Sequence, residues 1–289
     1  MDAFLTFYVI ALGLVVGSYL NVVIHRLPRG TSTVLPRSAC PFCGSLIAAR
    51  DNLPLISFLL LRGRCRHCRS PIAWRYPALE AATALLFLFC YRAFGPSPDR
   101  FFRDGTWLLA AAFGCLLLAL AGIDLEHLLL PDRLTLPGIA AGLLLQPWLP
   151  WGEAQRAALA AAWPAVAEAL PEWFQHLLVG ALGALAGAGV LLAVYGGWYL
   201  LRRTEGLGLG DVKMLAMIGA FLGWTGVLGT LLVATFTAST VAIVAMLLGR
   251  LSLQHKMAFG PFLTLGALVS LLAVGRGGVL GLLTPLLGW

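Results

Sequence analysis

Long apolar segments recur along almost the whole chain and constrain its fold more than any other feature. A helix needs about 20 apolar residues to cross the hydrocarbon core of a bilayer, which is about 30 Å thick. Of the 289 residues, 60% are hydrophobic and only 11% are charged, a composition that excludes an ordinary soluble domain. We therefore predict an all-α polytopic membrane protein with about eight transmembrane helices. The predicted spans are residues 4–23, 76–94, 106–123, 134–149, 176–201, 213 to 223–227, 228–248 and 257–289.

The basic residues are unevenly distributed and indicate the topology. Nine of the 18 arginines lie between Arg26 and Arg75, where Asp51 is the only acidic residue. Cytoplasmic loops collect arginine and lysine, so this loop is predicted to be cytoplasmic and the N-terminus external. A basic soluble domain would suggest nucleic acid as a partner. Here the topology accounts for the net charge of +7, so we expect the lipid bilayer as a partner and no nucleic acid.

The same loop contains two cysteine pairs, Cys40-Pro-Phe-Cys43 and Cys65-Arg-His-Cys68. Each Cys-x-x-Cys turn can place two thiolates on one metal ion, and two such turns complete a tetrahedral zinc site. Two disulfides are the alternative, but a loop that faces the reducing cytosol favours zinc. A site closed by four sulfur atoms is structural rather than catalytic, and His67 is expected to be a surface residue.

These features suggest a division into three parts. We expect a first transmembrane helix, then a small cytoplasmic zinc-knuckle domain, and then a transmembrane core with the remaining spans. The predicted boundaries are 1–25, 26–75 and 76–289.

A glycine-rich polar stretch, Glu205-Gly-Leu-Gly-Leu-Gly-Asp-Val-Lys213, lies between two apolar segments. Gly206, Gly208 and Gly210 weaken a helix and allow another backbone to come close. Irregular backbone at membrane depth is tolerated only where it is buried in protein or lines a water-filled cavity. We therefore expect Asp211 at a hydrated break, at the head of the next helix. A connecting loop with an N-capping aspartate is the alternative.

A second polar stretch, Ile123-Asp-Leu-Glu-His-Leu-Leu-Leu-Pro-Asp-Arg-Leu-Thr135, follows the third predicted span. Asp124 lies at the end of a fully apolar span, which does not require a solvent-exposed capping residue. The alternative is that Asp124 only anchors this helix end at the membrane interface. Asp132 follows a proline and precedes a new apolar run, which is typical of a turn or a helix start. Counting the spans places Asp124 and Asp211 on the same, cytoplasmic side of the membrane.

Two aspartates on one side of the membrane can act as a pair. Like charges a few Å apart do not both ionise easily, so the two carboxyl groups would share one proton. The ionised member can take a proton from the water that attacks a peptide carbonyl, while the protonated member hydrogen-bonds to the carbonyl oxygen. Gly208 and Gly210 would admit an extended substrate, and Lys213 would bias the charge on Asp211 or bind a substrate group.

A transporter with a proton-relay aspartate pair is the alternative function. Such a protein would more naturally place its aspartates near the midplane of broken helices, often in repeated halves. We find no internal repeat in this sequence, and the two aspartates are expected at helix ends. The pattern therefore favours proteolysis.

Several motifs resemble one known family. Gly208-Leu-Gly-Asp-Val-Lys213 resembles the Gly-x-Gly-Asp signature of membrane aspartyl proteases, and Asp124 with Pro131-Asp-Arg-Leu-Thr135 resembles the first aspartate motif of bacterial type IV prepilin peptidases. The likeness covers nearly the whole chain. Its other parts are Gly17-Ser-Tyr-Leu-Asn-Val-Val-Ile-His-Arg-Leu-Pro28, the two cysteine pairs, Asp51-Asn-Leu-Pro54 and Phe259-Gly-Pro-Phe262.

The resemblance implies a bifunctional enzyme of the bacterial inner membrane. Members of this family cleave the short basic leader of type IV prepilins and type II secretion pseudopilins, after a glycine on the cytoplasmic side. They then N-methylate the new amino terminus with S-adenosylmethionine. On the matching positions Asp124 and Asp211 are the protease pair and Asp132 is structural, although a register with Asp132 as the partner stays open.

The loop of residues 28–75 is associated by the same resemblance with methyl transfer and zinc. The external segment at 150–173, expected to carry an amphipathic helix interrupted at Pro164, is longer than the family pattern suggests. No glycine-rich nucleotide loop on a strand–helix unit is present, so no methyltransferase residue is assigned.

Overall fold

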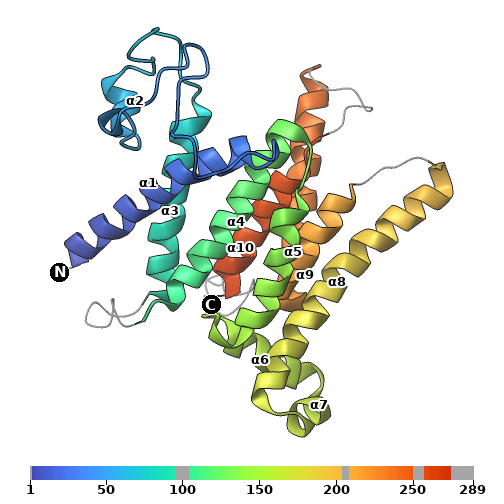
Figure 1. The fold of residues 1–289 in the computed structure, drawn as a ribbon. Helices are drawn as coiled ribbons and strands as arrows, with labels where there is room; N and C mark the ends of the chain where they lie inside the picture. Colours follow the sequence, from blue (N-terminus) through green and yellow to red (C-terminus); the bar gives the residue numbers. More distant parts are fainter. Residues whose placement is uncertain (1, 96–103, 204–207, 250–256, 275–289) are drawn as a thin grey trace. The chain divides into compact units, whose positions relative to one another are not determined.

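A computed structural model describes residues 2–95, 104–203, 208–249 and 257–274 of the chain (Figure 1). Within these residues the structure is helical, and the only β-type pairings are two isolated bridges, which confirms the predicted all-α class. In chain order the elements are α1 (Asp2–Arg26), η1 (Ala49–Asp51), α2 (Ile56–Leu60), α3 (Arg75–Phe94), α4 (Thr106–His127), α5 (Asp132–Leu145), η3 (Gln146–Trp148), α6 (Gly152–Ala162), α7 (Pro164–Ala169), α8 (Glu172–Arg202), α9 (Leu209–Leu247) and α10 (Gly260–Val274).

The chain forms two compact units, Met1–Ala119 and Leu120–Trp289, and α4 runs across the division. The predicted boundaries at 25/26 and 75/76 stay a prediction. In the first unit α1 packs closely against α3. A Cβ atom at Gly13 would lie 2.7 Å from Cα of Ala84, and one at Gly17 would lie 2.8 Å from Cα of Glu80. These glycines therefore permit the close approach of the two helices, as is common in membrane proteins.

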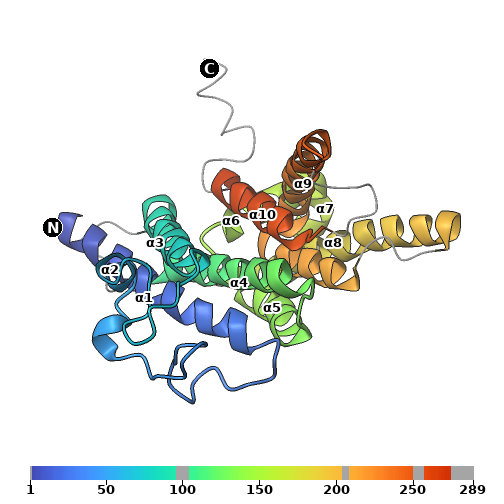
Figure 2. The same ribbon diagram turned by 90° about the horizontal axis from the view of Figure 1, so that it is seen from above.

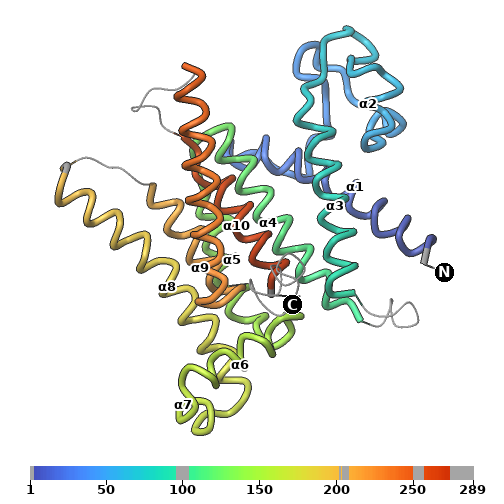
Figure 3. The backbone as a smooth tube through the Cα atoms, turned by 180° about the vertical axis from the view of Figure 1, so that it is seen from behind, coloured from blue at the N-terminus to red at the C-terminus, as the bar shows by residue number. Residues whose placement is uncertain are grey.

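In the second unit α9 is bent rather than straight (Figure 3). Gly223 inside it has φ 65° and ψ −178°, a backbone conformation that is not helical. A Cβ atom at Gly219 would lie 2.9 Å from Cγ2 of Val227, whereas residues eight apart in a straight helix are separated by about 12 Å. The chain therefore turns sharply at Gly223 and divides α9 into two limbs, 209–222 and 224–247.

The two limbs pack against different helices. A Cβ atom at Gly183 of α8 would overlap the carbonyl oxygen of Gly219 in the first limb. A Cβ atom at Gly266 of α10 would overlap the carbonyl oxygen of Thr230 in the second limb. Figure 2 shows α10 beside α9, in agreement with these contacts. The core of this unit is thus built on glycines at helix crossings.

Buried side chains cap the bend of α9. Carbonyl groups in the last turn of a helix have no partner within that helix. Gln146 Nε2 donates to the carbonyl oxygen of Ala220 at 2.8 Å, and Trp151 Nε1 donates to that of Phe221 at 2.8 Å. Gln155 Nε2 also donates to the Phe221 oxygen, at 3.2 Å. All three donors are at most 4% exposed, so the cap is enclosed.

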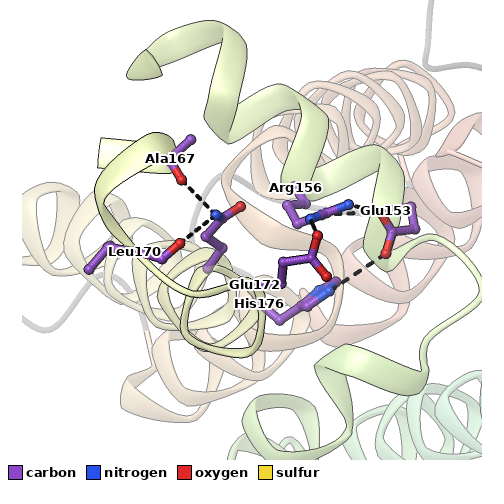
Figure 4. Close-up of polar contacts among 7 residues, drawn as sticks. Glu153, Arg156, Ala167, Leu170, Glu172 and His176 are labelled. Carbon is purple, nitrogen blue, oxygen red and sulfur yellow. Dashed lines mark hydrogen bonds and ion pairs between the residues drawn. The ribbon is translucent and has the colours of Figure 1, made fainter. Parts of the chain in front are cut away.

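Sequence reasoning assigned no role to the segment at 150–173 apart from an amphipathic helix. The structure shows two helices there, α6 and α7, separated at Trp163 next to Pro164 as predicted. Polar contacts join this segment to α8 (Figure 4). Arg156 donates to Glu153 and to Glu172, and Gln175 donates to the Ala167 and Leu170 carbonyl oxygens. The segment therefore packs as part of the unit and supplies Gln155 to the cap.

Five helices in the described residues are long and apolar enough to cross a membrane, namely α1, α3, α4, α8 and α9. The predicted total of eight is not confirmed. The predicted span 134–149 contains most of the 14-residue α5, which is about 21 Å long and short for a bilayer crossing. The two spans predicted between 213 and 248 lie in one continuous element, α9, but its bend at Gly223 falls at the predicted boundary of 223–227 between them. The last segment is described only as far as 274, and the rest of it lies outside the described residues.

Candidate active site and metal centre

A cavity of about 490 Å³ in the second unit lies where the end of α4 meets the starts of α5 and α9. The charged residues of this unit lie outside the middle of its apolar helices. The helix ends that meet at this cavity are therefore polar. All five residues predicted for this site line the cavity. The lining residues are Asp124, Leu128, Leu129, Leu130, Pro131, Asp132, Gly208, Gly210, Asp211 and Lys213.

Asp124 lies in the last turn of α4 and is only 6% exposed. Its Oδ2 accepts a hydrogen bond of 2.8 Å from the backbone N–H of Gly260, the first residue of α10. Sequence reasoning missed this partner. The available signal was the Phe259-Gly-Pro-Phe262 motif, since a proline just inside an apolar run marks a helix start.

Asp211 lies in the first turn of α9 and is partly exposed, and Gly208 precedes the helix as its N-cap. Gly208 has extended backbone, φ −78° and ψ 136°, which any residue can adopt. Gly210 is more restricted, because a Cβ atom there would lie 2.9 Å from Cβ of Leu130. It therefore lets the start of α9 approach the α4–α5 connection closely. Glu205 and Gly206 lie outside the described residues.

Asp132 and Lys213 form an ion pair on this cavity, with 2.6 Å between Oδ1 and Nζ. Both side chains are partly exposed, 55% for Asp132 and 38% for Lys213. Asp132 is also the first residue of α5, where the helix dipole favours a negative charge. The carboxylate of Asp132 thus has a cationic partner, an arrangement that favours a structural role and leaves Asp124 as the buried carboxyl group that lines the cavity with Asp211.

The four loop cysteines come together in the first unit. The Sγ atoms of Cys40, Cys43, Cys65 and Cys68 all lie within 4.8 Å of one another, and all four are free thiols. Cys40 Sγ and Cys68 Sγ are 3.8 Å apart. A tetrahedral zinc site with Zn–S bonds of about 2.3 Å has sulfur–sulfur edges of about 3.8 Å. The donor set and its spacing therefore fit a tetrahedral metal ion, whereas His67 is exposed and outside the cluster, as predicted.

The two cysteine turns have equivalent backbone hydrogen bonds. Cys40 N–H donates to the Ser45 carbonyl, and Cys65 N–H donates to the Ser70 carbonyl, each at 2.9 Å. The isolated bridges Ala39↔Leu46 and Arg64↔Pro71 close the same two turns. Each pair of cysteines is thus held by a small, self-contained turn.

At Cys40 and Cys68, but not at Cys65, the turns also favour the thiolate form that binds metal. Hydrogen bonds from the backbone N–H groups of Cys43 and Phe42 lower the pKa of Cys40 to about 6. The Ser70 hydroxyl lowers the pKa of Cys68 from its ordinary value.

Two polar contacts fix the connection between the cysteine turns. Arg66 donates to both carboxylate oxygens of Asp51, through Nε at 2.7 Å and through Nη2 at 2.5 Å. Leu55 N–H donates to Oε2 of Glu80 in α3 at 2.8 Å, which joins the connection to the helix pair of this unit. The motif Asp51-Asn-Leu-Pro54 therefore has a structural explanation, because both contacts lie in it or next to it.

Two family models match successive parts of the chain. Residues 11–94 match the family model described as Bacterial Peptidase A24 N-terminal domain, and residues 111–246 match the Type IV leader peptidase family. No solved structure matches the chain.

Curated relatives match over most of their length. The prepilin leader peptidase/N-methyltransferase of Burkholderia pseudomallei (strain 1026b) is 36% identical over 289 residues, covering 91% of this chain and 84% of the relative. The protein with the same name from Dickeya chrysanthemi is 34% identical over 292 residues, covering 92% of each chain. That from Klebsiella pneumoniae is 42% identical over 229 residues, covering 77% of this chain and 87% of the relative.

The apolar helices and the acidic cavity define an integral membrane protein with a candidate aspartyl site. With relatives of this identity and coverage, the chain belongs to the type IV leader peptidase family.

Proposed function

We propose that this protein is an aspartic endopeptidase that removes the leader peptide of type IV prepilins and type II secretion pseudopilins. The observation that carries the proposal is the cavity that Asp124 and Asp211 line together, at the ends of two apolar helices. The names of the curated relatives support the same activity.

The proposed reaction uses the two carboxyl groups as acid and base. The ionised member of the pair takes a proton from water, and the resulting hydroxyl oxygen attacks the carbonyl carbon of the scissile peptide bond. The protonated member donates a hydrogen bond to the carbonyl oxygen. When the tetrahedral intermediate collapses, the carbon–nitrogen bond breaks. The leaving amine takes up the proton that the first carboxylate removed from water, so the pair again has one ionised and one protonated member.

The cavity is expected to open towards the cytoplasm at the bacterial inner membrane. This orientation rests on the arginines between Arg26 and Arg75, which predict a cytoplasmic loop. The ion pair of Asp132 with Lys213 lies on the same cavity, where it would fix the start of α5 against the start of α9. Substrate that enters there would meet Gly208 at the rim, which has no side chain to obstruct an extended peptide.

We further propose that the protein N-methylates the new amino terminus, with S-adenosylmethionine as the methyl donor. The names of the relatives carry this second activity. The four cysteines would hold a structural zinc ion, which would fix the fold of the loop in the first unit. No residue of this chain is assigned to methyl transfer.

The test uses the purified full chain in detergent and a synthetic peptide that contains a basic leader, a glycine and an apolar segment. Mass spectrometry is expected to show one cut after the glycine, and one added methyl group when S-adenosylmethionine is present. Absence of any cut, together with proton flux in proteoliposomes, would instead support a transporter with an aspartate relay.

A further inference from the structure

We propose that Gly260, the first residue of α10, is a positioning residue that holds Asp124 in its reactive orientation. This inference rests on the proposed function, because it assigns a role to a neighbour of the proposed catalytic pair. It also explains the Phe259-Gly-Pro-Phe262 motif, which the reaction itself does not use.

The contact is direct and buried. Gly260 N–H donates to Asp124 Oδ2 at 2.8 Å, and both residues are buried. Hydrogen bonds to a charged acceptor are stronger than those between neutral groups, and low solvent exposure strengthens them further. A carboxylate has several acceptor positions, so one bond to Oδ2 leaves capacity for a water molecule or a substrate group.

The helix dipoles explain why Asp124 needs this donor. Asp124 lies in the last turn of α4, where the partial negative charge of the helix end disfavours a carboxylate. Gly260 begins α10, and the positive end of that helix is presented to the same carboxylate. Asp211 differs, because it lies in the first turn of its own helix and has this advantage without outside help. The start of α10 therefore offsets an unfavourable position that Asp124, unlike Asp211, occupies.

The amide of Gly260 is available for this contact because of the local sequence. Pro261 has no N–H, and the amides of Phe262 and Leu263 both donate to the Phe259 carbonyl at 3.1 Å. Amide groups in the first turn of a helix have no partner within the helix. Asp124 therefore satisfies the amide that α10 itself leaves unpaired.

Glycine is required at this position by space. A Cβ atom at residue 260 would lie 2.7 Å from Oδ2 of Asp124 and 3.2 Å from both its Cβ and its Cγ. Carbon atoms do not approach an oxygen so closely without displacement. Any side chain at 260 would therefore push the carboxylate away from the position that the hydrogen bond defines.

The experiment compares Gly260→Ala with Gly266→Ala, the same substitution six positions further along α10. The added methyl group meets Asp124 in the first variant and the Thr230 carbonyl in the second. Displacement of a catalytic group by a fraction of an ångström lowers turnover, so kcat of Gly260→Ala is expected to fall about 10- to 100-fold. KM should stay within about twofold, because ground-state binding is not removed. Gly266→Ala should lose thermal stability, and any loss of kcat in its folded fraction should be smaller than that of Gly260→Ala, because its methyl group meets the α9 backbone and not Asp124.

A second measurement does not depend on activity. Gly260→Ala is expected to lower the Tm of the wild-type protein but to have much less effect in an Asp124→Ala background, where most of the obstructing carboxylate is absent. An equal loss of Tm in both backgrounds would overturn the proposed contact.

The outcomes distinguish an error about Gly260 from an error about the proposed function. If Asp124→Asn is inactive and Gly260→Ala retains the wild-type kcat, the role of Gly260 is wrong and the proposed protease pair stands. If Asp124→Asn cleaves normally, the proposed function of Asp124 fails, and the inference about Gly260 fails with it.

Discussion

The four cysteines of the first unit and the two aspartates of the second are brought together in different ways. The cysteines lie on two short turns, each closed by hydrogen bonds that span only a few residues. The aspartates come from α4 and α9, and one of them needs an amide from α10. The first arrangement depends on local backbone, whereas the second depends on how helices distant in sequence pack.

This difference has a consequence for mutations. A site built on local turns is sensitive mainly to its own ligands and to the residues within each turn. A site built on helix ends is sensitive to packing at a distance, because a shift of one helix moves one carboxyl group relative to the other. Substitutions at the two sites should therefore differ in how far their effects extend.

The largest effect is expected at the aspartates. Asp124→Asn or Asp211→Asn should reduce leader cleavage by about 100- to 10,000-fold, because each removes one member of the acid–base pair. Peptide cleavage is measured by mass spectrometry, and Tm and metal content should match the wild type. Cleavage at the normal rate by either variant would show that the substituted residue is not catalytic.

A smaller, selective effect is expected at the cysteines. Cys40→Ser or Cys65→Ser should abolish zinc binding, since each removes one of four ligands, and the first unit should lose stability. Methyl transfer should fall more than cleavage. The family resemblance associates the loop of residues 28–75 with methyl transfer, whereas the aspartate cavity lies in the second unit. Metal analysis and the two activities provide the readout, with Cys90→Ala as the matched control, a buried free thiol outside the cluster. A fully active enzyme that binds no metal would contradict the zinc site.

A weaker effect again is expected at the ion pair on the cavity. Exposed ion pairs contribute about 0.2–1 kcal/mol, so Asp132→Asn or Lys213→Gln should reduce cleavage by no more than about fivefold. The double variant with Asp132→Lys and Lys213→Asp should regain most of the lost activity. If Asp132→Asn is instead as inactive as Asp211→Asn, Asp132 is the catalytic partner and the register with Asp124 is wrong.

The smallest effect concerns one difference between the two cysteine turns. Gly44 and Arg69 occupy equivalent places, four residues after the first cysteine of each pair, and have φ of 70° and 61°. Left-handed backbone costs a non-glycine residue about 1–2 kcal/mol, so Arg69→Gly should raise the thermal stability slightly and Gly44→Ala should lower it. Zinc stoichiometry and cleavage should not change. A large change in cleavage would show that the cysteine turns influence the aspartate site.

Sequence reasoning succeeded where the structure depends on local pattern. The helical class follows from the apolar segments, and the four cysteines can be grouped from the Cys-x-x-Cys spacing alone. The cavity that contains Asp124 and Asp211 was also anticipated, because both acids end or begin an apolar segment. Their catalytic role stays a prediction.

The remaining features depend on contacts that hydropathy does not detect. The predicted boundary at 223–227 agrees with the bend at Gly223, but apolar composition cannot show which donors cap that bend, nor that α5 ends after 14 residues. Gln146 falls in the predicted span 134–149 and Gln155 in the predicted external segment, yet both are buried against the carbonyl groups of α9. Gly260 could be recognised only as part of a motif, since its partner is 136 positions away in the chain.

The bend of α9 ties the 150–173 segment to the end of the same limb that carries Asp211. Residues 209–222 carry Asp211 near one end, and the other end is clamped by Gln146, Trp151 and Gln155. The limb is thus held near Asp211 by the Lys213–Asp132 ion pair and at its other end by these three donors. Shortening the chain around α6 would remove the contacts at the second end. A relative with a shorter segment here would have to supply another donor, or a trapped water molecule, for the carbonyl equivalent to that of Phe221 in order to hold the position of Asp211 equally steady.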